Sequence, residues 1–388
     1  MLKKSLLQIS KFVAPEIIFG QGALSQVGES AARLGIKKAF LVSDQGILGV
    51  GWVDRALDFL KDVGIGAVVW NDVSTNPKDS EVARGTEYYL ANQCDGIVAV
   101  GGGSPIDVAK AIAILVTNGG QIKDYEGVNK ITCPLPPMVI VATTAGAGSE
   151  VSQFSMIVER ERQAKMSIIS KSLVPDIAIV DPVILQTKGP RLTAATGVDA
   201  LSHAIEAYVS LAATPLTDVH ALAAIHLISE NLRESVACKA NLEAKSAMAM
   251  ASLQAGLAFS NAILGATHAM THQIDGLLDL HHGETNGILL PYVMEFNMIS
   301  NGEKFAKIAR SMGVQTEGLG KWKAAEKGIC AVRKLFQDIG IPEKLAQVGM
   351  KEEDIPKLSA NALKDTCMVT NPRDCCAEQI EALYRRAL

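Results

Sequence analysis

The first half of the chain alternates short apolar runs with amphipathic stretches. Apolar side chains recur at helical spacing in residues 52–63, 81–93 and 104–117. Short apolar runs lie around these stretches, at residues 39–43, 67–70, 96–100, 138–143 and 177–180. Apolar strands separated by helices are typical of a parallel sheet that is covered on both faces. A hairpin is predicted where a polar turn separates residues 154–159 from residues 165–170.

The pattern changes in the region between Pro182 and Pro190. From Thr193 onward the sequence holds long helical patterns and no strand run bounded by turn signals. Clear examples are residues 198–211, 217–232 and 242–259. The sequence therefore predicts an α/β domain over residues 1–185 and an all-α domain over residues 186–388.

Charge and cysteine content restrict the partners and the compartment. The 388 residues include 37 Lys and Arg against 41 Asp and Glu, a net charge of −4. This balance creates no broad positive field, so we expect neither nucleic acid nor a membrane surface as a partner. No uninterrupted apolar stretch approaches the ~18 residues of a membrane span. The seven cysteines form no Cys-x-x-Cys motif, which is typical of reduced thiols in a cytoplasmic protein.

A glycine-rich turn precedes one of the predicted helices. Gly101, Gly102 and Gly103 follow the apolar run at residues 96–100. We expect Ser104 to be the N-cap of the next helix and Asp107 to complete a capping box. Three glycines leave the helix N-terminus free of side chains, which suits a diphosphate. The alternative is a well-capped helix that merely follows a flexible turn.

Two further features lie after apolar runs. Asp44 ends the first run, where an acidic side chain can accept hydrogen bonds from ribose hydroxyls and repel a 2′-phosphate. The alternative is an ordinary turn aspartate before Gly46. A second loop of small residues follows the run at 138–143, over residues 143–149. Two such loops suggest one long ligand that crosses the strand ends, although two independent flexible loops fit the same pattern.

Histidines and one aspartate outline a metal site. Four of the seven histidines lie between His268 and His282. Asp199 and His203 are four residues apart, as are His268 and His272, so each pair shares one face of a helix. One carboxylate and two or three imidazoles can hold Fe(II) or Zn(II) with a coordination position left open. A chance ion pair and a histidine-containing loop are the alternatives. Spacing alone does not select the ligands among the clustered histidines, which include His281.

Six motifs carry a resemblance to a known family. They are GGGSPIDVAK at 101–110, TTAGAGSE at 143–150, GVDALSHAIEAY at 197–208, ATHAMTHQIDG at 266–276, HHGETNGILLP at 281–291 and NPRD at 371–374. In this order, over nearly the whole chain, they resemble the iron-containing (group III) alcohol dehydrogenases. The resemblance implies that the first domain is Rossmann-like and binds a dinucleotide, and that the helical domain binds a metal.

The resemblance also implies roles for individual residues. The metal ligands would be Asp199, His203, His268 and His282. His272 would lie beside the metal, where we hypothesise that it relays the alcohol proton; a hydrogen bond to a ligand is the alternative. The cofactor contacts would be Asp44, Asn76, Gly102, Gly103, Ser104, Asp107, Thr143, Thr144, Ser152 and Lys165. The substrate pocket would be formed by Phe154, Met156, Phe259 and Cys367. The role of His281 stays open.

The implied reaction is reversible hydride transfer between a short-chain primary alcohol (or a diol) and NAD, which gives the aldehyde. Fe(II) is the expected metal, with Zn(II) as the alternative, and a homodimer or an assembly of dimers is the expected state. Glycerol dehydrogenase-like polyol oxidation and a dehydroquinate synthase-like lyase are the rival activities. A scaffold without activity is disfavoured, because it would not need the complete ligand set.

Overall fold

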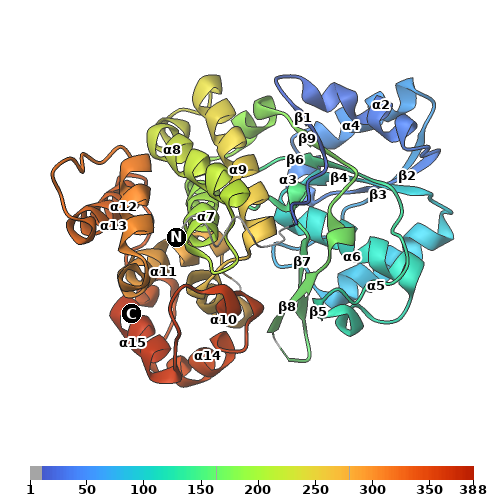
Figure 1. Ribbon diagram of the computed structural model, residues 1–388. Helices are drawn as coiled ribbons and strands as arrows, with labels where there is room; N and C mark the ends of the chain where they lie inside the picture. The colour runs from blue at the N-terminus through green and yellow to red at the C-terminus, as the bar shows by residue number, and fades with distance from the viewer. Residues whose placement is uncertain (1–10, 163, 279) are drawn as a thin grey trace. The chain divides into compact units, whose positions relative to one another are not determined.

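The computed structural model describes residues 11–162, 164–278 and 280–388, and these residues form two compact units (Figure 1). The first, called here the sheet unit, comprises Ala14–Gly189 and Lys239–Ala249. The second, the helical unit, comprises Pro190–Cys238 and Met250–Leu388 with residues 11–13. The predicted fold class, a parallel-sheet α/β region followed by a helical region, is confirmed.

The sheet unit is built on a six-stranded sheet in which every pair of neighbours is parallel. Across the sheet the strands are β1 (Glu16–Phe19), β9 (Ile177–Val180), β6 (Met138–Ala142), β4 (Gly96–Gly101), β2 (Lys38–Val42) and β3 (Gly66–Trp70). Alternate side chains enter opposite cores: Phe40 packs into one and Leu41 into the other. Because both faces are apolar, each strand needs cover on both sides.

Helices supply that cover (Figure 1). They are α2 (Val27–Arg33), α3 (Gln45–Leu48), α4 (Trp52–Asp62), α5 (Asp79–Ala91) and α6 (Gly103–Asn118). Residues of α2 and α4 line one core, and residues of α5 and α6 line the other. The predicted hairpin is confirmed: β7 (Phe154–Glu159) and β8 (Ala164–Ile169) are antiparallel, and β5 (Gly127–Val128) extends them.

Two local features differ from the sequence predictions. The edge strand β1 was not predicted, because four residues give little periodic signal. The predicted capping box of α6 is wrong: the helix begins at Gly103, and its N-cap is Gly102, which makes no side-chain cap. Ser104 Oγ donates to the carbonyl oxygen of Thr75 instead. Asp107 points inward and accepts from the amide of Met156 at 3.3 Å. Tertiary partners therefore replace the local cap.

The second half of the chain is helical throughout the residues described, as predicted. Its helices are α7 (Pro190–Val209), α8 (Pro215–Ala237), α9 (Leu242–Ala262), α10 (Ala266–Leu278), α11 (His282–Asn297), α12 (Gly302–Ser311), α13 (Lys321–Asp338), α14 (Ile355–Ala362) and α15 (Ala377–Ala387). The first of these begins earlier than the predicted residue 198, so Asp199 lies inside it. Among the described residues no helix alone has the length and apolarity to cross a membrane, and one bent pair, α9 with α10, passes that test jointly.

A glycine brings α11 against α7. A Cβ atom on Gly283 would lie 1.9 Å from the carbonyl oxygen of Ala195 in α7. Only a hydrogen atom fits there, so this position requires glycine. The contact holds the beginning of α11, and with it His282, close to the α7 turn that carries Asp199.

Replacing Gly283 with alanine should therefore lower the free energy of unfolding by about 1–3 kcal/mol, because the methyl group meets backbone that must move. Urea denaturation followed by circular dichroism measures the change. Gly66→Ala is the matched control, since nothing lies within 4 Å of a Cβ atom there. Equal midpoints for the two variants would contradict the close approach of α7 and α11.

Candidate active site

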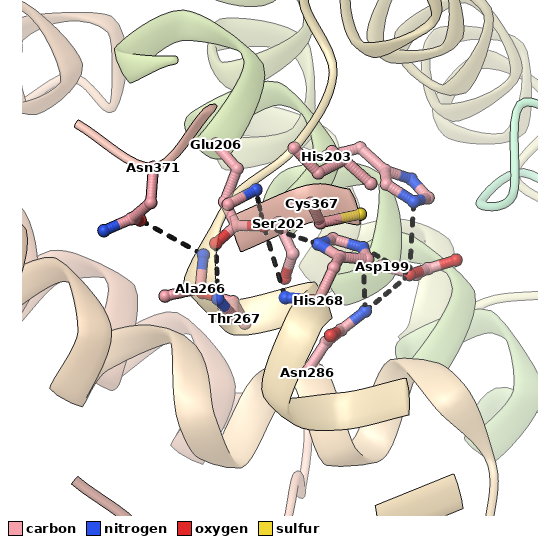
Figure 2. Close-up of polar contacts among 12 residues, drawn as sticks. Asp199, Ser202, His203, Glu206, Ala266, Thr267, His268, Asn286, Cys367 and Asn371 are labelled. Carbon is pink, nitrogen blue, oxygen red and sulfur yellow. Dashed lines mark hydrogen bonds and ion pairs between the residues drawn. The ribbon is translucent and has the colours of Figure 1, made fainter. Parts of the chain in front are cut away.

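Three imidazoles converge on one carboxylate oxygen in the helical unit. Asp199 and His203 lie on α7, His268 lies on α10, and His282 is the first residue of α11. The Nε2 atoms of His203, His268 and His282 each lie 3.8 Å from Oδ1 of Asp199 (Figure 2 labels the first two). Ligands at about 2.0–2.2 Å from a tetrahedral ion are about 3.3–3.6 Å apart. The observed separations are slightly wider than this, and the donor set has the chemistry of a divalent metal site.

Carboxylates fix two of these rings from behind. Nδ1 of His268 lies 2.7 Å from Glu206, and Nδ1 of His282 lies 2.6 Å from Asp275. A carboxylate at Nδ1 selects the tautomer in which Nε2 carries the lone pair that a metal would accept, and this arrangement recurs behind metal-bound histidines. Glu206 is itself held by the amides of Gly265, at 3.0 Å, and Thr267, at 2.6 Å.

Sequence reasoning missed both supporting carboxylates. Glu206 follows His203 by three residues on α7, and Asp275 follows His272 by three residues on α10. Both spacings keep the carboxylate on the helix face that bears the histidine. The helix periodicity therefore contained a usable signal for both residues.

The buried carboxylates and imidazoles of the cluster shift one another's pKa. Burial by itself would raise the pKa of Asp199, but the neighbouring histidines outweigh burial and hold that pKa far below its ordinary value. Burial alone would lower the pKa of His268, yet hydrogen bonds to Asp199 and Glu206 raise it to about 9. The two shifts arise from the same close pairing of imidazole with carboxylate, in which each charged group stabilises the other.

Other side chains enclose the same place. Asn286, one turn after His282 on α11, donates from Nδ2 to Oδ1 of Asp199 at 2.9 Å (Figure 2). Phe259 of α9 stacks on His203 with ring centroids 4.3 Å apart. The predicted pocket residue Phe259 is thus in contact with the imidazole cluster. Cys367, in the 3₁₀ helix Thr366–Thr370, is buried in the same unit.

His272 stands beside the cluster with a carboxylate of its own. Its ring stacks on His282 at 5.5 Å, and its Nδ1 lies 2.9 Å from Oδ2 of Asp365. The other oxygen of Asp365 accepts from the amide of Cys367 at 2.9 Å. Because Asp365 holds Nδ1 of His272, Nε2 is the ring nitrogen that can exchange a proton with a bound small molecule. His281 precedes α11 as its N-cap, and its buried Nδ1 has no hydrogen-bond partner among the described residues.

In the sheet unit the two glycine-rich loops touch each other. The amide of Thr143 donates to the carbonyl oxygen of Gly101 at 2.9 Å. A Cβ atom on Gly102 would lie 3.0 Å from Cγ2 of Thr144, and one on Gly103 would lie 3.1 Å from Cβ of Ala147. The glycines therefore provide space for the second loop. Together the loops form one continuous surface at the beginning of α6.

The predicted cofactor residues divide into two groups. The first group follows the carboxyl ends of four adjacent strands, and its members are Asp44, Asn76, Gly102, Gly103, Ser104, Thr143 and Thr144. This edge of a parallel sheet is where ligands of such folds bind. Asp44 also caps α3, because its Oδ1 accepts from the amide of Ile47 at 2.9 Å.

The second group lies around Lys110 of α6. Ser152 is buried, and its hydroxyl lies 3.2 Å from Nζ of Lys110. Asp107 is buried as well. Burial raises the pKa of Asp107 to about 6, and the positive charges of Lys110 and Lys165 oppose this rise only in part. On β7, Phe154 is buried and Met156 is half-buried. Lys110 was not singled out from the sequence.

Known proteins match most of both units. A family model described as iron-containing alcohol dehydrogenase matches residues 14–182, and the C-terminal model of the Fe-containing alcohol dehydrogenase family matches residues 193–388. The 1,3-propanediol dehydrogenase of Klebsiella pneumoniae is 46% identical over 379 residues, which are 97% of this chain and 98% of the relative. The NAD-dependent methanol dehydrogenase of Bacillus methanolicus is 40% identical over 377 residues, 97% of this chain and 99% of the relative.

Solved structures agree. The crystal structure of a 1,3-propanediol oxidoreductase superposes with a TM-score of 0.96 at 46% identity, over 98% of this chain and 100% of the other. A sulfoacetaldehyde reductase from Bifidobacterium kashiwanohense, in complex with NAD+, gives a TM-score of 0.87 at 30% identity, over 98% and 99%. The chain belongs to the iron-containing alcohol dehydrogenase family, and it is an NAD-dependent alcohol dehydrogenase.

Proposed function

We propose that this enzyme holds a divalent ion, Fe(II) by family membership, with Asp199, His203, His268 and His282. The observation that carries the proposal is the equal 3.8 Å separation of three Nε2 atoms from one carboxylate oxygen. The carboxylates behind His268 and His282 support it, because they orient ligands and raise their basicity. Zn(II) fits the same donors. When bound, the ion supplies Lewis-acid polarisation of the alcohol or carbonyl oxygen.

We propose that NAD lies along the carboxyl ends of β2, β3, β4 and β6. The first amides of α6 are available to a diphosphate, since Gly102 offers no side-chain cap. Asp44 would accept hydrogen bonds from ribose hydroxyls and repel a 2′-phosphate, which favours NAD over NADP. The other proposed cofactor contacts at this strand edge are Asn76, Ser104, Thr143 and Thr144. Asp107, Ser152 and Lys165, which lie around Lys110, are the remaining ones. When bound, NAD supplies the hydride acceptor.

We assign the proton transfer to His272. Asp365 holds Nδ1 of its ring, so Nε2 is the position that would take the proton from the substrate hydroxyl and return it in the reverse reaction. The stacking on His282 keeps the ring next to the proposed ligands. The alternative weighed from the sequence, a hydrogen bond from His272 to a ligand, would need Nε2, because Nδ1 is bound to Asp365.

The proposed substrate is a short primary alcohol or diol, oxidised reversibly to the aldehyde. Phe259 and Cys367 would contact the substrate near the metal ligands. Phe154 and Met156, on β7 of the sheet unit, are the other two pocket residues that the resemblance implies. The names of the relatives, which include propanediol and methanol dehydrogenases, support this class. The proposed state is a homodimer or an assembly of dimers in the cytoplasm. The seven cysteines, all free, support a reducing compartment.

A panel of alcohols tests the substrate class. NADH formation should be at least about tenfold more efficient, in kcat/KM, with 1-butanol or 1,3-propanediol than with glycerol, because a third hydroxyl would be buried against apolar side chains. Higher efficiency with glycerol would favour polyol oxidation instead. Failure of every alcohol to yield net NADH, in the metal-loaded enzyme, would favour a lyase that returns its hydride.

Substituting the shared carboxylate tests the metal site. Asp199→Ala should lose bound metal and activity together, because the three imidazoles no longer have an anionic ligand to complete the set. Metal content after anaerobic purification, measured by mass spectrometry alongside the 1,3-propanediol rate, gives both quantities. An active variant that contains no metal would end the assignment.

His272→Ala is the matched control on α10. It removes an imidazole next to the cluster but none of the proposed ligands, so metal content should equal that of the wild type. The rate should fall by about 10²- to 10⁴-fold, the usual contribution of a general acid–base group. Loss of metal in this variant would make His272 a ligand rather than the proton carrier.

A further inference from the structure

A lysine ammonium is buried inside the sheet unit. Lys110 lies on α6 with no exposed surface. Its Nζ lies 2.7, 2.6 and 3.1 Å from the carbonyl oxygens of Ser149, Ser152 and Phe154. The hydroxyl of Ser152 is a fourth acceptor, at 3.2 Å. An ammonium has three donors, and here all of them face one short segment, residues 149–154.

Burying this charge is costly, so packing alone does not explain it. Burial lowers the pKa of Lys110 to about 8, against the opposing charges of Asp107 and Glu150. Burial also raises the pKa of Glu150 to about 7. A methionine would fill the same stem volume without any charge to desolvate. Unlike an apolar side chain, the ammonium can donate hydrogen bonds to the carbonyl oxygens of residues 149–154.

Asp107, a second residue of α6, forms hydrogen bonds with the same stretch of chain. Asp107, one turn before Lys110, accepts from the amide of Met156 at 3.3 Å through Oδ2. The main-chain carbonyl of Asp107 accepts from the hydroxyl of Ser155 at 2.8 Å. The cation thus holds carbonyl oxygens and the anion holds an amide. We call Asp107 and Lys110 the α6 clamp, and residues 149–156 the clamped segment.

The clamped segment continues the loop that contacts the glycine turn. The loop of residues 143–149 touches Gly101, Gly102 and Gly103, and α6 begins at the last of these glycines. One helix therefore presents its N-terminus at the loop surface and, one to two turns later, fixes the far end of the same loop. The position of this loop relative to the helix N-terminus depends on the clamp.

We propose that Lys110 is a positioning residue for NAD: its ammonium acts as an internal counter-ion that holds residues 149–154 in the shape required for cofactor binding. The proposal rests on the proposed location of NAD at this strand edge. Lys110 itself touches no reacting atom. Removing its charge should weaken NAD binding and leave the chemical step at saturating NAD nearly unchanged.

Two variants test the proposal through binding. Lys110→Met keeps the stem volume, and Lys110→Ala leaves an empty socket lined by carbonyl oxygens. The dissociation constant of NADH, measured by fluorescence titration of metal-free protein, should rise at least about tenfold in both, which corresponds to about 1.4 kcal/mol. The kcat of the metal-loaded enzyme at saturating NAD should stay within about threefold. Lys123→Met, at an exposed lysine, is the control for loss of one positive charge.

Chemical rescue separates the charge from general packing. In Lys110→Ala, n-propylammonium has the length of the missing stem and should restore NADH affinity to within about threefold of the wild type. Lys110→Met should not respond, because its side chain fills the socket. Tetramethylammonium, which is too bulky and has no N–H donor, should have no effect on either variant. Weakened binding that n-propylammonium does not restore would overturn the role of the ammonium.

Wild-type affinity, within twofold, in folded Lys110→Met and Lys110→Ala would also overturn the proposal. If neither variant folds, as judged by circular dichroism, Ser155→Ala replaces them. This change removes the hydrogen bond to the carbonyl of Asp107 without changing charge, and unchanged NADH affinity would then overturn the clamp.

Gly102→Val distinguishes failure of the clamp proposal from failure of the proposed cofactor site. It fills the surface at the start of α6, so wild-type NADH affinity in that variant would mean that NAD binds elsewhere.

Discussion

The helical unit depends on one buried concentration of charge. Asp199, Glu206 and Asp275 are all buried. The ring of His268 lies between Asp199 and Glu206, and the ring of His282 lies between Asp199 and Asp275. Buried carboxylates are stable only when positive charge and hydrogen-bond donors surround them. Protonation of His268 can supply one such charge, as its raised pKa indicates. A divalent ion at the meeting point of the Nε2 atoms would supply two, and would satisfy the carboxylate and the ring nitrogens together.

The surrounding architecture brings these groups together from distant segments. Three different helices contribute the proposed ligand atoms, so a metal site there requires their crossing to be exact to a fraction of an ångström. The glycine at 283 allows the beginning of α11 to rest on the backbone of α7. Apolar side chains of α10 and α11 pack with α14 and α15 in a common core, and the hydroxyl of Tyr384 donates to the carbonyl oxygen of Met270 at 2.8 Å. Helix packing thus fixes the relative positions of His268 and His282.

The sheet unit also contains buried charged side chains, which lie close to its two glycine-rich loops. For NAD to bind where we propose, the strand edge must leave backbone amides open to an anionic ligand, and the glycines before α6 carry no side chains that would cover them. In our proposal Asp107 and Lys110, which are buried on α6, support that edge through their hydrogen bonds to residues 149–156. In both units, therefore, buried charged groups behind the surface hold the groups that would meet a ligand.

Much of this organisation is readable from the sequence. Apolar runs predict the parallel sheet, because its strands are buried on both faces. Apolar residues at helical spacing predict the helical half, because each helix buries one side. The capping box at Ser104 and Asp107 was predicted and is wrong, since both side chains have partners outside their own helix. Local pattern cannot reveal such partners. Glu206 and Asp275 stand at readable helical spacings, whereas the role of Lys110 depends on carbonyl oxygens some forty residues away.

The central claim is that Asp199 and three histidines together hold the metal. X-ray absorption of the protein loaded with one equivalent of Zn(II), which does not change oxidation state, tests that claim directly. The predicted result is a shell of nitrogen and oxygen at about 2.0–2.2 Å with the multiple scattering of three imidazoles. A sulfur scatterer at about 2.3 Å, or scattering from fewer imidazoles, would contradict the claim, because the metal would then have drawn ligands from elsewhere, such as Cys367.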